Sequence, residues 1–213
     1  MKKILLISMA VILIASISMA QKTVYDTRSQ IQIGVKAGTN LSSVYDTKSD
    51  NFNVDSKFGF VGGGFVLIPI GTFIGFHPEL LFSQKGYTSS GSYLGIIDYK
   101  FSRTSNFIDV PLLFAIKPLS MLTFVAGPQF SYLVSQKDEI TSGELTDEQI
   151  DEFSNDNLRK NTMCFLGGID FSVKHVVIGA RVGWDIQDNN GDGTSTDPRY
   201  KNVWYQATFG IKL

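Results

Sequence analysis

The chain has 213 residues and a formal net charge of −1 at pH 7, a balance that gives no support to a nucleic-acid partner. Its length allows one domain of ordinary size. The single cysteine, Cys164, excludes an intrachain disulfide framework. We interpret Cys164 as a small apolar residue in the wall of the fold, without a chemical role.

The first residues, 1–20, predict a signal peptide that is removed on export. Two lysines follow the initial methionine, residues 4–17 are mostly apolar, and Ser18 and Ala20 are the small residues of a cleavage site. The mature domain is therefore expected at 21–213. An uncleaved anchor is the alternative, although the apolar run is short for a span of about 20 residues. No later run has the length of a membrane helix, so a membrane domain would have to cross as strands.

Apolar and polar side chains begin to alternate at Ile31. From Ile31 to Leu41 every second residue is apolar or Thr39, and the residues between them are polar or glycine. The segment 202–213 repeats this alternation to the last residue. A helix would spread such residues around its whole surface, whereas a strand collects them on one face. Both segments are therefore predicted to be strands.

Six further segments between these two have the same character, although a run of three glycines hides the two faces of the first. The six segments are 57–68, 73–87, 106–117, 122–135, 162–174 and 176–186. The total is eight predicted strands. Each is about as long as the ~9–11 residues that a tilted membrane strand requires.

The connections between the predicted strands alternate in length. The short ones lie at 69–72, 118–121 and 174–175, and the long ones at 42–56, 88–98, 136–160 and 187–200. Short periplasmic turns and long extracellular loops are typical of outer-membrane barrels. The sequence therefore predicts an all-β fold: a closed, antiparallel, up-and-down transmembrane β-barrel of about eight strands. The alternative is a soluble β-sandwich or a lipocalin-like barrel, whose apolar face would point inward.

In a membrane barrel the polar faces of the strands point inward. Six charged residues on these faces are expected to form ion pairs there: Lys36, Glu79, Lys85, Asp109, Asp170 and Arg181. The interior of an eight-stranded barrel is just wide enough to be filled by side chains. We therefore expect no solute conduction and interpret the charges as a structural network. Tyr132, Trp184 and Tyr205 lie on the apolar face near strand ends, as aromatic girdles do.

Five ordered segments carry a family resemblance: 34–41 (GVKAGTNL), 78–86 (PELLFSQKG), 109–113 (DVPLL), 127–129 (GPQ) and 179–183 (GARVG). Together they resemble the PorT-like outer membrane protein beta-barrel family of small porin-family proteins. The resemblance implies an outer-membrane location and an eight-stranded barrel, but no reaction. The last strand also resembles the signal that barrel-assembly machinery reads, although it ends in Leu213 where an aromatic residue is more usual.

A loop rich in aspartate, asparagine and glycine suggests a calcium site. Asp188, Asn190 and Asp192 have the oxygen-ligand spacing of the first half of an EF-hand loop, and Gly193 stands at its sharp turn. The twelfth position is Arg199 where a bidentate glutamate is expected. An ordinary surface loop is the competing interpretation. Weakly bound calcium is thus a hypothesis, and no other cofactor is expected.

The long connection 136–160 carries many acidic residues. Within it, the segment TDEQ at 146–149 forms a capping box, which predicts a short helix at about 147–154. The acidic segment could be a solvated cap over the barrel or a docking surface for a cation or a partner.

Catalysis has little support, because His77 is predicted in the barrel wall and His175 in a periplasmic turn, away from any recognisable nucleophile motif. We expect a non-enzymatic outer-membrane protein with a structural or surface-interaction role. A small solute channel, or a component associated with transport or secretion, is the alternative, and a membrane enzyme is a third. Expected partners are outer-membrane lipid, the barrel-assembly machinery during insertion, and an unidentified extracellular or periplasmic partner.

Overall fold

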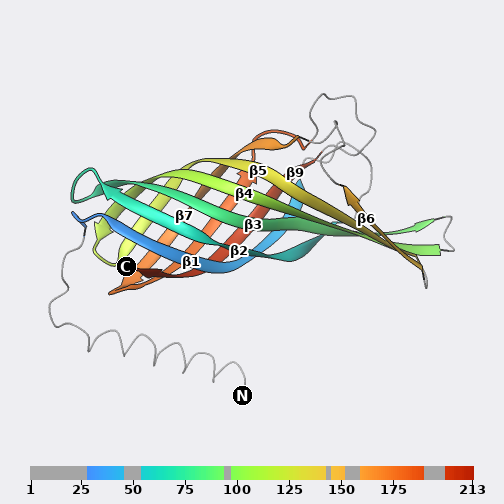
Figure 1. Ribbon diagram of the computed structural model, residues 1–213, viewed down its shortest axis with the longest axis horizontal. Helices are drawn as coiled ribbons and strands as arrows, with labels where there is room; N and C mark the ends of the chain where they lie inside the picture. The colour runs from blue at the N-terminus through green and yellow to red at the C-terminus, as the bar shows by residue number, and fades with distance from the viewer. Residues whose placement is uncertain (1–27, 46–53, 94–96, 143–144, 152–158, 190–199) are drawn as a thin grey trace, which may run out of the picture.

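A computed structural model of the chain describes residues 28–45, 54–93, 97–142, 145–151, 159–189 and 200–213 (Figure 1). The signal peptide expected at 1–20 lies outside the described residues. Within them, no helix is both long enough and apolar enough to cross a membrane.

Nine antiparallel β-strands form the described fold, and eight of them close into a barrel. Their bounds are β1 Gln32–Tyr45, β2 Val54–Pro69, β3 Ile74–Tyr93, β4 Ile97–Leu119, β5 Leu122–Ser142, β6 Leu145–Asp151, β7 Asn161–Val173, β8 Val176–Asp185 and β9 Lys201–Lys212. The pairing order β4-β3-β2-β1-β9-β8-β7-β5 is closed by a further pairing of β4 with β5. The prediction of a closed, eight-stranded, up-and-down barrel is confirmed, and β6 is attached to β5 outside the ring.

The tight turns gather at one end of the barrel. Residues 70–73 join β2 to β3, residues 120–121 join β4 to β5, and residues 174–175 join β7 to β8. Lys174 has a φ of 52°, the left-handed conformation common in two-residue hairpin turns. The start of β1 and the end of β9 lie at this same end (Figure 1), because Gly34 pairs with Lys212 and Ile211 pairs with Val176, the residue after the turn at 174–175. The predicted short turns are therefore present together at the end that outer-membrane barrels place in the periplasm.

The outer surface of the barrel is apolar, and the interior is polar. Phe60, Leu80, Phe114, Ile178 and Tyr205 come from five different strands and are 52–64% exposed. Soluble monomers rarely expose so large a continuous apolar surface. This arrangement excludes the soluble alternative, in which these side chains would fill a dry centre. Hydrocarbon is the solvent that such a surface requires.

The residues on either side of the glycine run show which face of β2 points outward. Phe58 and Phe60 point outward, at 72% and 52% exposed, whereas Val61 and Phe65 are buried in the barrel. At Gly63, a Cβ would lie 2.1 Å from the carbonyl oxygen of Leu80 on the neighbouring strand. Any side chain at this position would therefore push β2 away from β3.

Two of the predicted long loops are wrong, because the strands continue through them. The loop predicted at 88–98 is mostly strand: β3 runs to Tyr93 and β4 starts at Ile97. In the region 136–160, β5 runs to Ser142 and is followed by β6. As a result β3, β4 and β5 have 20, 23 and 21 residues, whereas β8 and β9 have 10 and 12. The longer strands project beyond one end of the barrel (Figure 1).

The helix predicted at 147–154 is also wrong. Residues 145–151 form β6, which pairs with β5 from Ser142↔Leu145 to Gln136↔Asp151. The remaining residues of the predicted helix, 152–154, lie outside the described part. A capping box supplies one or two local hydrogen bonds, and an isolated helix this short is marginal in water. Pairing with the exposed edge of β5 offers a hydrogen-bond ladder along the whole segment instead.

Placing a charge on the apolar outer face should destabilise the barrel in a membrane. Phe114 is 61% exposed on β4, and we expect Phe114→Arg to lower the free energy of unfolding by about 2–4 kcal/mol. The loss follows from moving a guanidinium into hydrocarbon. Equilibrium unfolding of the protein folded into phospholipid vesicles measures it.

The matched control is Thr141→Arg, because Thr141 is exposed on the part of β5 that projects beyond the barrel. This change should alter the free energy of unfolding by less than about 0.5 kcal/mol. Equal losses for the two variants would mean that the belt around Phe114 does not contact lipid.

Candidate functional site

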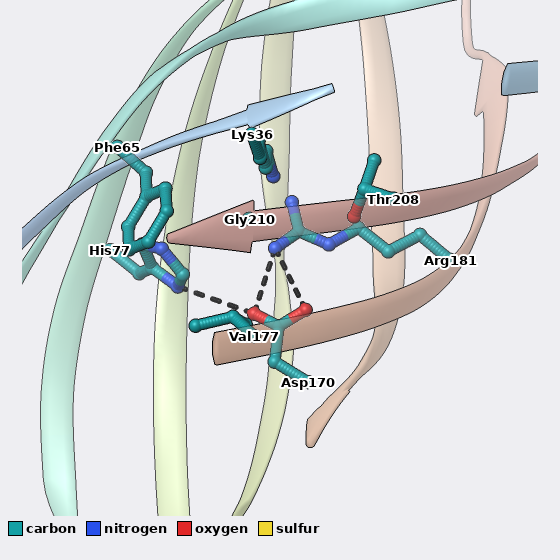
Figure 2. A pocket seen from close by; sticks show the side chains of 8 residues that line it. All are labelled: Lys36, Phe65, His77, Asp170, Val177, Arg181, Thr208 and Gly210. Carbon is teal, nitrogen blue, oxygen red and sulfur yellow. Dashed lines mark hydrogen bonds and ion pairs between the residues drawn. The ribbon is translucent and has the colours of Figure 1, made fainter. Parts of the chain in front are cut away.

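The largest group of interior charges lies in the half of the barrel near the tight turns. Lys36 extends from β1, Glu79 from β3, Asp170 from β7 and Arg181 from β8. Each lies on the inward face of its strand, because residues of one strand alternate between the two faces. Figure 2 shows Lys36, Arg181 and Asp170 converging with His77 on the same space. We call Lys36, His77, Glu79, Asp170 and Arg181 the inner charge cluster.

Two cations pair with the two carboxylates of the inner charge cluster, and Arg181 contacts both carboxylates. Lys36 Nζ donates to Glu79 Oε2 at 2.5 Å, and an Arg181 guanidinium nitrogen donates to Glu79 Oε1 at 2.7 Å. The other terminal nitrogen of Arg181 donates to both oxygens of Asp170, at 2.9 and 3.2 Å. All four side chains are at most 5% exposed. Charges removed from water to this degree require such pairing.

His77 completes the inner charge cluster without a hydrogen bond. Its Nε2 lies 3.4 Å from Glu79 Oε1 and its Nδ1 lies 3.8 Å from Asp170 Oδ2. Both ring nitrogens are buried and have no hydrogen-bond partner in the protein. The ring packs edge-on against Phe65, with the ring centroids 5.4 Å apart. The sequence placed His77 in the wall but not in the network, although its i, i+2 relation to Glu79 puts both residues on one face.

A small cavity adjoins the cluster. It is bounded by Lys36, Phe65, His77, Asp170, Val177, Arg181, Thr208 and Gly210 (Figure 2). Its volume is about 10 Å³, which is the space of a single water molecule. A water molecule in this cavity would lie beside His77, whose two ring nitrogens have no hydrogen-bond partner in the protein. The cavity is too small for an organic substrate or a hydrated ion.

A second group of charges lies apart from the inner cluster. Lys85 Nζ is 3.0 Å from Asp109 Oδ2 and 3.8 Å from the ring of Trp204. Nearby, Cys164 Sγ donates to Asp185 Oδ1 at 3.0 Å. The six charged residues expected to form one network are thus divided into the inner cluster and a separate Lys85–Asp109 pair. The positions that the sequence analysis did not connect to them are Trp204 and Asp185.

Apolar side chains fill much of the remaining interior. The buried apolar group consists of Leu67, Leu113, Ala115, Val125, Cys164, Leu166 and Trp204. Leu113, Leu166 and Trp204 are each 0% exposed. Ions lose their hydration in contact with such side chains, so this group opposes their passage.

An arginine-centred group lies at the opposite end, where the long strands leave the barrel. Arg103 binds Asp138 with two hydrogen bonds, of 2.8 and 2.5 Å, and donates to the Tyr200 hydroxyl at 3.1 Å. Tyr87 packs on Tyr200 with the ring centroids 5.3 Å apart. Arg103, Tyr87 and Tyr200 are at most 7% exposed. The sequence does not predict this group, because Asp138 and Tyr200 lie in segments expected to be loops.

The predicted calcium loop is described only at its start. Asp188 Oδ1 lies 3.8 Å from Lys201 Nζ, while Asn190 and Asp192 lie outside the described residues. Among the residues that the structure does describe, no three His, Cys, Asp or Glu side chains are grouped so as to hold a metal ion. Calcium binding at 188–192 stays a prediction.

Removing the shared cation from the inner charge cluster should be costly. Arg181→Met leaves Asp170 without its bidentate partner and Glu79 with one cation, so we expect a loss of about 3–5 kcal/mol in the free energy of unfolding. Adding Glu79→Gln and Asp170→Asn should restore part of it. Lys137→Met, which breaks the half-exposed pair of Lys137 and Glu139, is the control and should cost less than about 1 kcal/mol. Equal losses for Arg181→Met and Lys137→Met would contradict this account.

The chain matches one protein family and is similar to several solved structures. No curated protein matches the chain. Ail, the attachment invasion locus protein of Yersinia pestis, is similar at 13% identity and a TM-score of 0.45, over 85% of this chain and 98% of that chain. Neisserial surface protein A is similar at 12% identity and a TM-score of 0.47, over 85% and 97%. The outer membrane protein OprG from Pseudomonas aeruginosa is similar at 14% identity and a TM-score of 0.35, over 86% and 94%. Residues 19–191 match the family described as outer membrane protein beta-barrel domain, and the chain belongs to that family.

Proposed function

We propose that this protein is a non-enzymatic and non-conducting barrel of the bacterial outer membrane that presents a rigid β-sheet for contact at the cell surface. The observation that carries the proposal is the extension of β3, β4 and β5 beyond the barrel, where they are joined by β6 (Figure 1). We call the outer parts of these strands, 84–93, 97–106 and 135–142, together with β6, the projecting sheet.

The projecting sheet is long enough to reach well beyond the membrane surface. β3 has about ten residues more than β8, which corresponds to roughly 33 Å along the strand. Its strands stay in register to their tips, with Tyr93 paired to Ile97 and Ser142 paired to Leu145. A sheet with continuous pairing holds its side chains in fixed positions, unlike a loop of the same length.

The base of the projecting sheet is attached firmly to the barrel. The Arg103–Asp138 pair joins β4 to β5 on the inner face, and a hydrogen bond from Arg103 to the Tyr200 hydroxyl connects β4 to the residue that precedes β9. On the outer face Asn106 bonds to Gln84 and to Ser135. Hydrogen bonds on both faces support a sheet that keeps a constant angle to the barrel.

The packing of the interior supports a role without conduction. The inner charge cluster, the Lys85–Asp109 pair and the buried apolar group lie in the described interior, and the buried side chains of Arg103 and Tyr200 lie at its outer end. A solute channel, which is the alternative function, would require these groups to separate. Steady single-channel currents through the protein in planar bilayers would favour that alternative over our proposal.

Catalysis is not part of the proposed function. His77 is 4% exposed inside the barrel and His175 lies in a tight turn at the opposite end from the projecting sheet. The proposal has four further parts. They are membership of the PorT-like branch, export by the signal peptide at 1–20, insertion by barrel-assembly machinery, and a weak calcium site at Asp188, Asn190 and Asp192. They are supported by sequence patterns alone.

Shortening the projecting sheet should remove surface contact and leave the barrel intact. In the shortened variant, Asn-Gly turns replace 89–101 and 140–147, so that the pairs Thr88↔Ser102 and Glu139↔Glu148 close two-residue hairpins. We expect this variant to fold and insert as the full chain does. We expect the number of attached cells on glass, or on surfaces coated with protein or polysaccharide, to be at least several-fold higher for cells that express the full chain than for cells that express the shortened chain.

A variant altered at the other end of the barrel is the control. Lys174→Asn with His175→Gly changes a turn far from the projecting sheet and should leave attachment unchanged. Full attachment by the shortened variant, or no gain in attachment from the full chain on any surface, would contradict a surface-interaction role.

A further inference from the structure

A polar band begins directly beyond the apolar belt on the outer face of β3, β4 and β5. Phe82 and Tyr132 are outward-facing residues of the belt, at 40% and 43% exposed. Two residues beyond Phe82, Gln84 Nε2 donates to Asn106 Oδ1 at 3.1 Å, and Asn106 Nδ2 donates to Ser135 Oγ at 2.9 Å. This amide ladder crosses three strands and marks where hydrocarbon gives way to a polar environment.

Three lysines reach the outer face just above this ladder. Lys57 Nζ donates to Ser102 Oγ at 2.7 Å and to Thr104 Oγ1 at 2.5 Å. Lys137 is paired in register with Thr104. Lys100 lies two residues from Ser102 on the same face and is exposed. We call Lys57, Lys100, Ser102, Thr104 and Lys137 the lysine–hydroxyl face.

An irregularity in β2 brings Lys57 to this face. The register of β2 on β3 shifts between Ser56 and Val61, and Lys57 lies within the shift. A bulge inserts an extra residue and redirects the side chains around it. The ammonium group of Lys57 thereby reaches across β3 to two hydroxyls of β4.

In the described part of this surface the three lysines lie beside two carboxylates. Asp55 is exposed on β2, in the row of paired residues that runs through Thr88 and Ser102 to Glu139. The Glu139 carboxylate lies 2.9 Å from Lys137 Nζ. Both members of that pair remain about 40% exposed, so Lys137 is accessible to a ligand. In the register of β5 with β6, Glu139 is paired with Glu148.

We infer that the lysine–hydroxyl face binds the phosphorylated sugar headgroup of a glycolipid in the outer leaflet. Lysine ammonium groups donate charge-assisted hydrogen bonds to phosphate oxygens, and the serine and threonine hydroxyls both donate to and accept from sugar hydroxyls. The face begins about 7 Å beyond the amide ladder, two residues along each strand. A lipid whose chains lie against the apolar belt would therefore have its headgroup at the lysines. Most of this face lies near the base of the projecting sheet, and the inference does not depend on the surface contact proposed for that sheet.

Binding of lipid A tests the inference. The folded full-length protein in a neutral detergent is mixed with bisphosphorylated lipid A or with its dephosphorylated form, and retention is measured by native mass spectrometry. We expect the phosphorylated form to bind at least ten-fold more tightly. The variant Lys57→Gln/Lys100→Gln/Lys137→Gln should lose about five-fold in affinity per lysine, or roughly 100-fold in total. Lys174→Gln at the opposite rim is the matched control and should bind as the native protein does.

The far-ultraviolet circular dichroism of the triple variant should equal that of the native protein, since all three lysines lie outside the barrel interior. Equal binding of the two lipid A forms, or full binding by the triple variant, would overturn the inference. Inorganic phosphate is the second probe. Complete displacement of lipid A by millimolar phosphate would assign the face to a free anion rather than to a membrane lipid.

Discussion

The closed ladder of backbone hydrogen bonds is the constraint on which the rest of this structure depends. Hydrocarbon offers no partner to an unpaired N–H or C=O group, so strands can cross a membrane only in a ring without edges. The pairings β1–β9 and β4–β5 complete that ring. Once the ring is closed, alternation along each strand decides everything else: side chains such as Leu80 face lipid, and their neighbours such as Glu79 face a narrow interior.

That narrow interior explains why the buried charges are arranged as they are. Arg181 bridges Glu79 and Asp170, and Lys36 neutralises the second oxygen of Glu79. Each charge would be unstable without the others, so the cluster ties β1, β3, β7 and β8 together across the barrel. Outside the membrane a strand does not need apolar side chains on its outer face. There β3, β4 and β5 continue as a polar sheet, because each strand still satisfies the backbone of the next.

The barrel could be predicted from the sequence because lipid requires apolar side chains on one face of each strand, while the interior holds polar side chains on the other. Segments such as 31–41 and 202–213 carry that signal in full, and the tight turns follow from it. The interior charges were also predictable, since Lys36, Glu79 and Arg181 occur on polar faces. Their division into two groups was not, because spacing along one strand does not reveal which strands meet across the barrel. The projecting sheet was missed for a related reason: residues 88–92 and 136–139 are polar or glycine at every position, so they lack the alternation that identifies a strand. His77 and Arg103 show the same limit, because their roles depend on partners from distant strands.

The central claim is that successive side chains of a strand face lipid and the barrel interior in turn, and the most direct test is to measure the lipid exposure of successive residues on one strand. The single cysteine, Cys164, can be replaced by serine, and spin labels can then be placed one at a time on β3 at Glu79, Leu80, Leu81 and Phe82 in vesicles. The account predicts that labels at Leu80 and Phe82 collide with oxygen dissolved in the bilayer, while labels at Glu79 and Leu81 are immobilised and reached by neither oxygen nor a water-soluble nickel complex. Strong collisions of the nickel complex with the labels at Leu80 and Phe82 would contradict it.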